Sequence, residues 1–236
     1  MTLREKYGEW GIILGATEGV GKAFCERLAK EGMNVVMVGR REEKLKELGE
    51  ELKNTYEIDY KVVKADFSLP DATDKIFAAT ENLDMGFMAY VACLHSFGKI
   101  QDTPWEKHEA MINVNVVTFM KCFYHYMKIF AAQDRGAVIN VSSMTGISSS
   151  PWNGQYGAGK AFILKMTEAV ACETEKTNVD VEVITLGTTL TPSLLSNLPG
   201  GPQGEAVMKT AQTPEEVVDE AFEKLGKRTV CHFRRA

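Results

Sequence analysis

The stretch Trp10-Gly-Ile-Ile-Leu-Gly-Ala-Thr-Glu-Gly-Val-Gly21 decides which fold we predict for this chain. An apolar run ends at Leu14, glycines follow at positions 15, 19 and 21, and a helical pattern occupies residues 22–31. Glycine at such places allows a tight turn, close approach of the backbone to a pyrophosphate, and tight packing of a helix on a strand. The glycines alone are equally compatible with a plain strand-to-helix turn.

Short β-rich runs alternate with helical patterns along the rest of the chain. Alternation of this kind predicts a mostly parallel sheet with helices on both faces, in a doubly wound α/β fold of the Rossmann type. The 236 residues, 44% of them hydrophobic, suffice for one such domain over residues 1–236. Helices are expected at 42–56, with Leu45, Leu48 and Leu52 on one face, and after the capping box Thr213-Pro-Glu-Glu216. The predicted strands are 10–14, 34–38, 60–65, 86–92, 137–141 and 181–186.

Composition excludes several functional classes. The formal charge of −5, from 27 basic and 32 acidic residues, gives no electrostatic reason to expect a nucleic-acid partner. The five cysteines form no C-x-x-C pair, so we expect reduced thiols in a cytoplasmic protein and no metal site. No apolar run approaches the ~18 residues of a membrane span, so no membrane association is expected.

A tyrosine and a lysine one helical turn apart, Tyr156-Gly-Ala-Gly-Lys160, form the second informative motif. At positions i and i+4 the two side chains share a helix face, and a nearby ammonium is expected to lower the pKa of the phenol. A tyrosine tuned in this way can transfer protons near neutral pH. Ser143, at the end of a predicted strand, would bind a carbonyl oxygen beside it. A bare Y-x-x-x-K is also common on ordinary amphipathic helices, so the glycine loop is needed to give it weight.

Together these motifs resemble the short-chain dehydrogenase/reductases, which are NAD(P)-dependent enzymes, over residues 9 to about 225. The resemblance implies hydride transfer with Tyr156 as general acid or base, Ser143 polarising the carbonyl, and Lys160 tuning Tyr156 and binding the nicotinamide ribose. It also implies a homodimer or homotetramer, and a water held by Asn115 in a proton relay, although Asn115 could instead be a helix-interior asparagine that bonds to the backbone. The helix through residues 116–130, apolar on much of its surface, is expected to be deeply buried or shared with a second subunit. The residues expected to bind the cofactor are Gly15, Thr17, Gly19, Val20, Gly21, Arg40, Arg41, Asp66, Tyr156, Lys160 and Thr191.

The end of the second predicted strand indicates which cofactor is used. It reads Gly39-Arg40-Arg41, with no acid for the ribose hydroxyls of NAD. Guanidinium groups match the oxygens of a 2′-phosphate, so we predict NADP(H). Two alternatives stay open: the arginines could pair with Glu42 or Glu43, and Glu18 in the glycine loop is unfavourable to a phosphate. Asp66 is expected at the adenine edge, although it could equally cap the helix near Pro70.

The substrate is expected to be large and apolar. Residues 188–212 carry several leucines, including Leu198, between glycines and prolines, and this composition suits a mobile lid over a substrate cavity. Phe97, Trp152 and residues 148–150 could line that cavity. The likeness extends to family members that act on steroids and implies a bile acid or other steroid substrate. His95 and His108 are expected to be surface or packing residues. Another carbonyl or ketoacyl reductase and a non-catalytic NADP-binding sensor remain as alternatives.

Two stretches depart from the pattern of the family. Tyr90-Val-Ala-Cys93 stands where many members have Asn-Asn-Ala-Gly, which leaves the geometry of that loop open. After Lys227 only nine residues follow, so we expect the last strand and the longer tail of related chains to be missing.

Overall fold

A computed structural model describes residues 1–148, 150–196, 201–227 and 230–232. The seven strands of this part form one parallel sheet in the order β3-β2-β1-β4-β5-β6-β7. The sheet order turns back at β1, since β2 and β3 lie on one side of it and β4 to β7 on the other, as a doubly wound fold requires. The strands are β1 (Trp10–Leu14), β2 (Asn34–Gly39), β3 (Tyr60–Lys64), β4 (Met85–Tyr90), β5 (Gly136–Ser143), β6 (Val179–Leu186) and β7 (Val230–His232).

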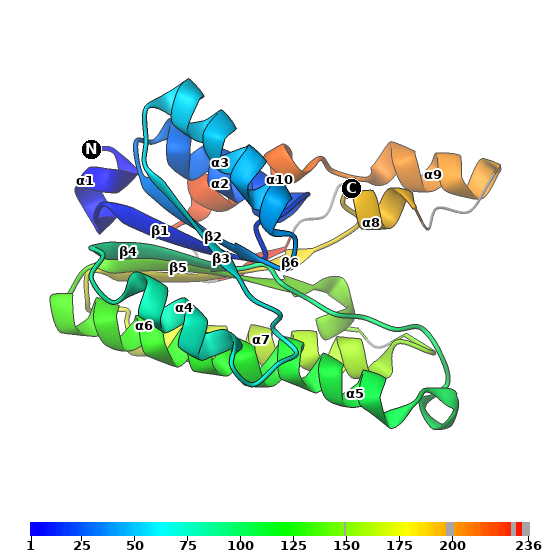
Figure 1. Cartoon of the computed structure of the whole chain (residues 1–236). Helices are drawn as coiled ribbons and strands as arrows, with labels where there is room; N and C mark the ends of the chain where they lie inside the picture. Colours follow the sequence, from blue (N-terminus) through cyan, green and yellow to red (C-terminus); the bar gives the residue numbers. More distant parts are fainter. Residues whose placement is uncertain (149, 197–200, 228–229, 233–236) are drawn as a thin grey trace.

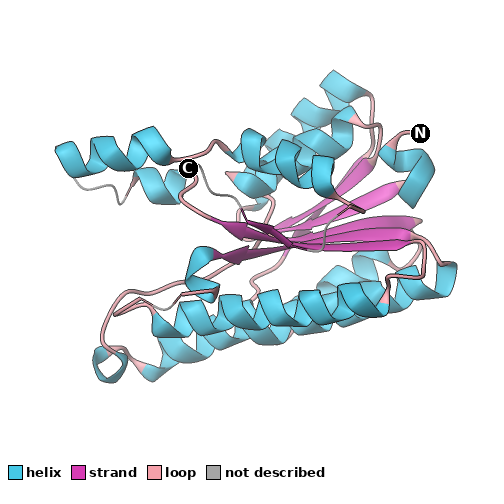
Figure 2. Ribbon diagram, turned by 180° about the vertical axis from the view of Figure 1, so that it is seen from behind, coloured by secondary structure: helices cyan, strands magenta, loops and turns pink. Residues whose placement is uncertain are grey.

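Helices cover both faces of this sheet (Figures 1 and 2). One layer contains α2 (Val20–Lys30), α3 (Glu42–Tyr56) and α10 (Pro214–Lys224). The opposite layer contains α4 (Ala72–Thr80), α5 (Trp105–Ile112), α6 (Phe119–Gln133) and α7 (Gly154–Glu173). The short helix α1 (Leu3–Tyr7) precedes β1, while α8 (Pro192–Leu195) and α9 (Pro202–Thr210) lie beyond the end of β6. The predicted single Rossmann-like domain is therefore confirmed.

The two layers pack on two separate apolar cores, one on each face of the sheet. Alternate residues of each central strand supply them: Ile13 belongs to the core under α2 and α3, whereas Ile12 and Leu14 belong to the core over α6 and α7. All three side chains are fully buried, and each such burial stabilises the fold by roughly 1.5–3 kcal/mol. Strands that are buried on both faces have continuous apolar sequences, which is why 10–14 could be predicted to the residue.

Two helices begin as the sequence predicts. The helix α3 spans Glu42–Tyr56 and buries Leu45, Leu48 and Leu52. At the start of α10, Thr213 Oγ1 accepts a hydrogen bond from the Glu216 amide at 3.1 Å, and the Glu216 carboxylate accepts one from the Thr213 amide at 2.9 Å. This reciprocal pair is the predicted capping box.

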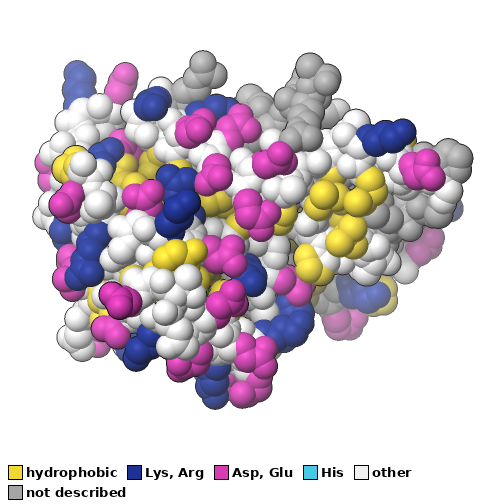
Figure 3. Space-filling model, turned by 90° about the horizontal axis from the view of Figure 1, so that it is seen from above, with side chains coloured by type: hydrophobic (Ala, Val, Ile, Leu, Met, Phe, Trp, Pro, Cys, Tyr) yellow, Lys and Arg dark blue, Asp and Glu magenta, His cyan; other side chains and the backbone are white. Residues whose placement is uncertain are grey.

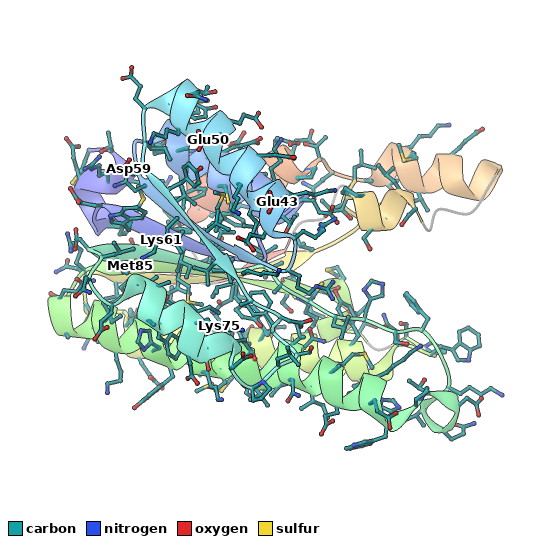
Figure 4. The ribbon with its side chains drawn as sticks, viewed as in Figure 1. Glu43, Glu50, Asp59, Lys61, Lys75 and Met85 are labelled. Carbon is teal, nitrogen blue, oxygen red and sulfur yellow. The ribbon has the colours of Figure 1, made fainter. Side chains whose placement is uncertain are left out.

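The edge strand β3 is protected by charge. Lys61 donates a hydrogen bond from Nζ to the Ala79 carbonyl at 2.7 Å, which closes the strand against α4. On the other face the Tyr60 hydroxyl bonds to the carboxylate of Glu50 on α3. Figure 4 shows Glu50, Lys61 and Lys75 around this edge. Charged side chains along an edge discourage pairing with another sheet.

One expectation about the carboxyl end was wrong. We expected no strand after Lys227, yet Val230–His232 forms β7, which pairs in parallel with Val183–Thr185 of β6. The free edge of β6 offers unpaired backbone groups, and three extended residues suffice to bond with them. Residues 228, 229 and 233–236 of the tail lie outside the described part.

The helix predicted through residues 116–130 is divided in two. Asn113–Thr118 forms a π-helical turn, and α6 continues from it. Phe119, Phe123 and Phe130 are buried within the chain, as expected, while Tyr124 and Val117 remain exposed. π-Helical turns often accompany functional sites. Within the described residues, no helix combines the length and the apolar character needed to cross a bilayer.

Candidate active site

A cleft of about 1210 Å³ opens at the carboxyl ends of the strands. This is the edge at which parallel α/β sheets bind ligands. The β1–α2 loop, the end of β2 and Asp66 line one end of the cleft, which we call the cofactor end. Leu94, Phe97, Met144, Asn153 and Tyr156 line the other, which we call the substrate end.

Close backbone contacts explain the glycines at the cofactor end. A Cβ on Gly21 would lie 1.9 Å from the Gly15 carbonyl oxygen, and one on Gly15 would lie 2.6 Å from the Ala92 amide nitrogen. Gly15 also has φ +104° and Gly19 has φ +57°, a region that L side chains rarely adopt. Gly19 caps α2 without any side-chain bond, and Gly19 and Val20 at the start of this helix line the cleft. Such a helix start is suited to bind phosphate.

The two predicted phosphate-binding arginines have different surroundings. Arg41 Nη2 pairs with Glu18 Oε2 at 2.7 Å, whereas Glu42 pairs with Lys46 at 2.9 Å. Arg41 therefore pairs with Glu18 in the cleft wall and not with Glu42 or Glu43, the alternative that the sequence left open. Arg40 lines the cleft with an exposed side chain. Arg41 neutralises the acid that we considered unfavourable.

Asp66 lines the cleft but does not cap a helix. Its Oδ1 accepts hydrogen bonds from the Ser68 amide at 3.0 Å and the Ser68 hydroxyl at 2.7 Å, and Asp71 precedes α4. Burial alone would raise the pKa of the Asp66 carboxyl, but the Ser68 bonds and the charge of Arg40 hold the pKa below its usual value. The open alternative of a helix cap near Pro70 is therefore wrong.

The remaining predicted cofactor residues also gather at this end. Thr17 and Val20 line the cleft. Thr191 caps α8, its Oγ1 accepting from the Leu194 amide at 3.2 Å. Its methyl carbon lies 3.0 Å from the place where a Cβ on Gly19 would be. The segment after β6 thus closes against the glycine loop.

Ser143, Tyr156 and Lys160 meet at the boundary between the two ends. Ser143 is the last residue of β5, and Tyr156 lies in the first turn of α7. Ser143 Oγ accepts hydrogen bonds from the Thr145 amide at 3.2 Å and the Thr145 hydroxyl at 3.0 Å, and its interaction with the phenol lowers the pKa of Tyr156. The Lys160 side chain is fully buried; its Nζ donates to the Val141 carbonyl at 2.8 Å and lies 5.7 Å from the centre of the Tyr156 ring.

The electrostatics of Tyr156 differ from the sequence-based expectation. Burial, and after it the negative charge of Cys93, raise the pKa of Tyr156, and the bond to Ser143 lowers it only in part. Burial also lowers the pKa of Lys160. The phenol pKa is therefore raised and not lowered as expected, because both groups are removed from water, which disfavours their charged forms.

Asn115 fixes the loop after β4. From the π-helical turn its Oδ1 accepts from the Leu94 amide at 3.0 Å, and its Nδ2 donates to the Leu94 carbonyl at 2.7 Å. Gly159 of α7 packs on it, since a Cβ there would lie 2.9 Å from the Asn115 Cβ. The role of Asn115 in a water relay stays a prediction.

The sequence analysis missed two groups beside Tyr156. Cys93 lines the cleft; the protein around its thiol would raise the pKa by desolvation, but the charge of Lys160 and a hydrogen bond to His95 lower the pKa overall. The His95 ring meets the Tyr156 ring edge-on at 5.9 Å between centres. The departure of Tyr90-Val-Ala-Cys93 from the family pattern was the available signal. His108 is a packing residue as predicted, bonded to Gln155 and to the Ile100 carbonyl.

The predicted lid is tied together at its ends. The Leu190 amide donates to the Gln212 carbonyl at 2.8 Å, and the Gln212 amide donates to the Thr188 carbonyl at 3.0 Å. Between these ends, α8 and α9 extend beyond the sheet (Figure 1), and apolar side chains gather on that side of the molecule (Figure 3). Leu198 belongs to residues 197–200, which lie outside the described part of the chain. Lid motion stays a prediction.

Of the side chains expected to line the substrate cavity, Phe97 does so. Trp152 is 64% exposed and lies outside the described lining, as do Ser148 and Ser150. Ser149 is not among the described residues.

Comparisons with known proteins agree with this geometry. The family model for short-chain dehydrogenases matches residues 9–198. The chain is 85% identical to the 7β-hydroxysteroid dehydrogenase of Collinsella aerofaciens, covering 96% of this chain and 86% of that protein. It is 45% identical to the 7β-hydroxysteroid dehydrogenase of Clostridium sardiniense, over 97% of this chain and 86% of that protein.

A solved structure from work on the stereoselectivity of 7β-hydroxysteroid dehydrogenase superposes with a TM-score of 0.97. It is 82% identical in sequence and covers all of this chain and 91% of that one. The fold, the motifs and these likenesses agree, and this chain belongs to the short-chain dehydrogenase family of nicotinamide-dependent oxidoreductases.

Proposed function

We propose that this protein is an NADP(H)-dependent oxidoreductase that interconverts 7-oxo and 7β-hydroxy bile acids. One observation carries the proposal: Ser143, Tyr156 and Lys160 meet in a cleft between a glycine-rich phosphate cradle and an apolar pocket. The 85% identity to a 7β-hydroxysteroid dehydrogenase supports the substrate.

The residues of the cofactor end fit NADP(H). A Cβ at Gly15 would meet the Ala92 backbone and one at Gly21 would meet the Gly15 carbonyl, so only glycines allow the tight loop whose backbone would bind the pyrophosphate. The guanidinium of Arg40 would bind the 2′-phosphate, and Asp66 the adenine edge. Thr191, beside Gly19, would contact the nicotinamide carboxamide. When bound, this cofactor supplies a hydride to the substrate carbon or takes one from it.

The substrate end supplies the proton. The Tyr156 hydroxyl donates its proton to the carbonyl oxygen during reduction and removes it from the alcohol during oxidation. With its pKa raised by burial, the phenol is in the protonated form that reduction requires, whereas oxidation requires the phenolate. Ser143 donates a hydrogen bond to the same oxygen as negative charge develops on it. Asn115 holds the loop after β4 and a water that returns protons to Lys160 and Tyr156.

Turnover of a 7-oxo bile acid by purified protein tests the proposal. Oxidation of NADPH and NADH is followed separately, and the configuration of the product at C7 is identified. We expect faster oxidation of NADPH and formation of the 7β-alcohol. Rapid turnover of other ketones or acyl thioesters alone would indicate a different reductase, and NADPH binding without any turnover would indicate a cofactor sensor.

We also propose that the protein forms homo-oligomers through the outer surface of α5 and α6. Ile112, Val117 and Tyr124 lie there, between 39% and 59% exposed, and apolar side chains of this size gain stability when a partner covers them. Sedimentation analysis of the wild type and of Tyr124→Glu tests this: a dimer or tetramer that dissociates in the variant supports the surface, and a monomeric wild type contradicts it.

A further inference from the structure

The hydroxyl of Ser143 accepts two hydrogen bonds from a single residue, Thr145. The first comes from the Thr145 amide at 3.2 Å and begins the 3₁₀-helical turn η3 (Met144–Gly146), of which Ser143 is the N-cap. The second comes from the Thr145 hydroxyl at 3.0 Å. This second bond is not part of the cap, because capping satisfies backbone amides and not side-chain hydroxyls. It is an additional contact between two hydroxyl groups in the wall of the cleft.

The chemistry of a hydroxyl makes this arrangement directional. A serine hydroxyl has two acceptor lone pairs and one hydrogen to donate. With both lone pairs occupied by Thr145, Ser143 can form a further bond only as a donor. Ser143 lines the cleft beside Tyr156, so its hydrogen is left for an oxygen there. The interaction of Ser143 with the phenol lowers the pKa of Tyr156, which is the effect that a donor has.

Close backbone packing holds Thr145 in this position. A Cβ on Gly157, the residue after Tyr156, would lie 2.8 Å from the Thr145 carbonyl oxygen. A Cβ on Gly146 would lie 2.8 Å from the backbone of α7. The turn η3 and the helix α7 are thus in direct contact at two points where only glycine fits. The position of Thr145 is therefore fixed relative to both Ser143 and Tyr156.

A donor with a fixed direction suits the proposed reaction. The carbonyl oxygen of a ketone only accepts, and a donor already oriented toward it needs no reorganisation as negative charge develops. A serine with a free lone pair could instead accept a bond from the Tyr156 hydroxyl and divert the proton from the substrate. We propose, on the basis of the proposed function, that Thr145 is a positioning residue whose hydroxyl commits Ser143 to donate to the substrate oxygen.

Two substitutions at Thr145 test this role. Thr145→Val replaces the hydroxyl by a methyl group, and Thr145→Ser keeps the hydroxyl. We expect kcat for reduction of a 7-oxo bile acid to fall about 3- to 10-fold in Thr145→Val, the range for one hydrogen bond between neutral groups, and to stay within about 2-fold of the wild type in Thr145→Ser. KM and the Kd for NADPH should change less than kcat, because the oriented donor acts on the transition state.

A double-mutant cycle and a pH profile show whether Thr145 acts through Ser143. In the Ser143→Ala background, Thr145→Val should change kcat by less than about 2-fold, because the hydroxyl that it orients is absent. With Ser143 no longer held as a donor, the pKa of Tyr156 should rise in Thr145→Val. Oxidation of the 7β-alcohol, which needs the phenolate, should then begin at higher pH. A hydroxyl with a merely structural role would not shift the profile.

Thr167 provides a matched control. It is fully buried on α7 and lies outside the described lining of the cleft. Its Oγ1 donates to the Ile163 carbonyl at 2.7 Å and accepts from Asn140 Nδ2 at 3.0 Å. Thr167→Val should therefore lower the melting temperature, because both bonds stabilise the fold, and leave kcat and the pH profile unchanged.

The outcomes separate this inference from the proposed function. A wild type that reduces no 7-oxo bile acid contradicts the function, and the same variants are then compared on a ketone that it does reduce, because Thr145 acts on the carbonyl group. A wild type that reduces no ketone overturns both. Wild-type kcat in Thr145→Val, an equal loss in Thr145→Ser, a loss that persists in the Ser143→Ala background, or an unshifted pH profile overturns the role of Thr145 alone.

Discussion

The two ends of the cleft are built on different physical principles. At the cofactor end, backbone packs on backbone: the Gly21–Gly15 approach leaves no room for a Cβ. At the substrate end, side chains from segments far apart in the chain converge, such as Cys93, Ser143 and Tyr156. Positions where a Cβ is excluded can be recognised in the local sequence as glycines, whereas side chains that meet only through the tertiary fold cannot be recognised in this way. The comparison teaches that the cofactor can be inferred from one short stretch, while the substrate depends on long-range packing.

The largest expected effect concerns the substrate end. Tyr156→Phe removes the proton donor, so kcat for reduction of a 7-oxo bile acid should fall by about 10²–10⁴-fold. NADPH affinity should fall by no more than about 10-fold, because the ring and its packing remain and at most one neutral hydrogen bond is lost. Steady-state kinetics and a fluorescence titration with NADPH measure the two quantities. Loss of cofactor affinity together with turnover would show that the two ends are not separable.

The second largest effect is expected at the cofactor end, for the substitution Gly21→Ala. The new methyl group would meet the Gly15 carbonyl oxygen at 1.9 Å, so the loop must shift, at a cost of about 1–3 kcal/mol in the free energy of unfolding. We expect a lower melting temperature and weaker NADPH binding. Gly154→Ala is the control, since a Cβ there meets nothing within 4 Å. Unaltered NADPH affinity in Gly21→Ala would refute the steric account of the cradle.

A smaller effect is expected from the arginines. Arg40→Ala should reduce the preference for NADPH over NADH by about 10–100-fold, because charge-assisted bonds contribute about 1.5–3 kcal/mol. Arg41→Ala should have a weaker effect on the preference, because Arg41 already pairs with Glu18 at 2.7 Å. The ratio of kcat/KM for the two cofactors measures both variants. A larger loss in Arg41→Ala than in Arg40→Ala would reverse the assignment.

The smallest effect concerns pH. The charge of Cys93 is, after burial, a cause of the raised pKa of Tyr156. Cys93→Ser removes that negative charge, so the pKa of Tyr156 should fall, and alcohol oxidation, which needs the deprotonated phenol, should begin at lower pH. The pH profile of kcat for oxidation of the 7β-alcohol tests this. Cys172→Ser, at an exposed cysteine near the far end of α7, should leave the profile unchanged. A shift toward higher pH in Cys93→Ser would contradict the account.

Regular elements could be predicted well from the sequence because they follow from local patterns. The strand Trp10–Leu14 and the helix Glu42–Tyr56 have the predicted bounds, since apolar residues recur with the period of each element. The π-helical turn Asn113–Thr118 and the strand β7 were missed. A π-turn depends on tertiary contacts rather than on periodicity, and three residues are too few to display a period.

At the site, the type of each residue could be predicted better than its electrostatics. Ser143, Tyr156 and Lys160 come together as the motif indicates. The pKa of Tyr156, however, depends on how deeply the phenol is buried and on Cys93, which is distant in sequence. An asparagine directly before a helix predicts a cap, yet the Asn153 side chain makes no capping hydrogen bond to α7.

Transfer of deuterium from [4,4-²H₂]NADPH to a 7-oxo bile acid tests the central claim most directly. Mass spectrometry and NMR of the product locate the label and the configuration of the new alcohol. We predict one deuterium at C7, on the face opposite a 7β-hydroxyl, and no label in the Tyr156→Phe reaction over the same time. An unlabelled product, or a 7α-alcohol, would contradict the proposed function.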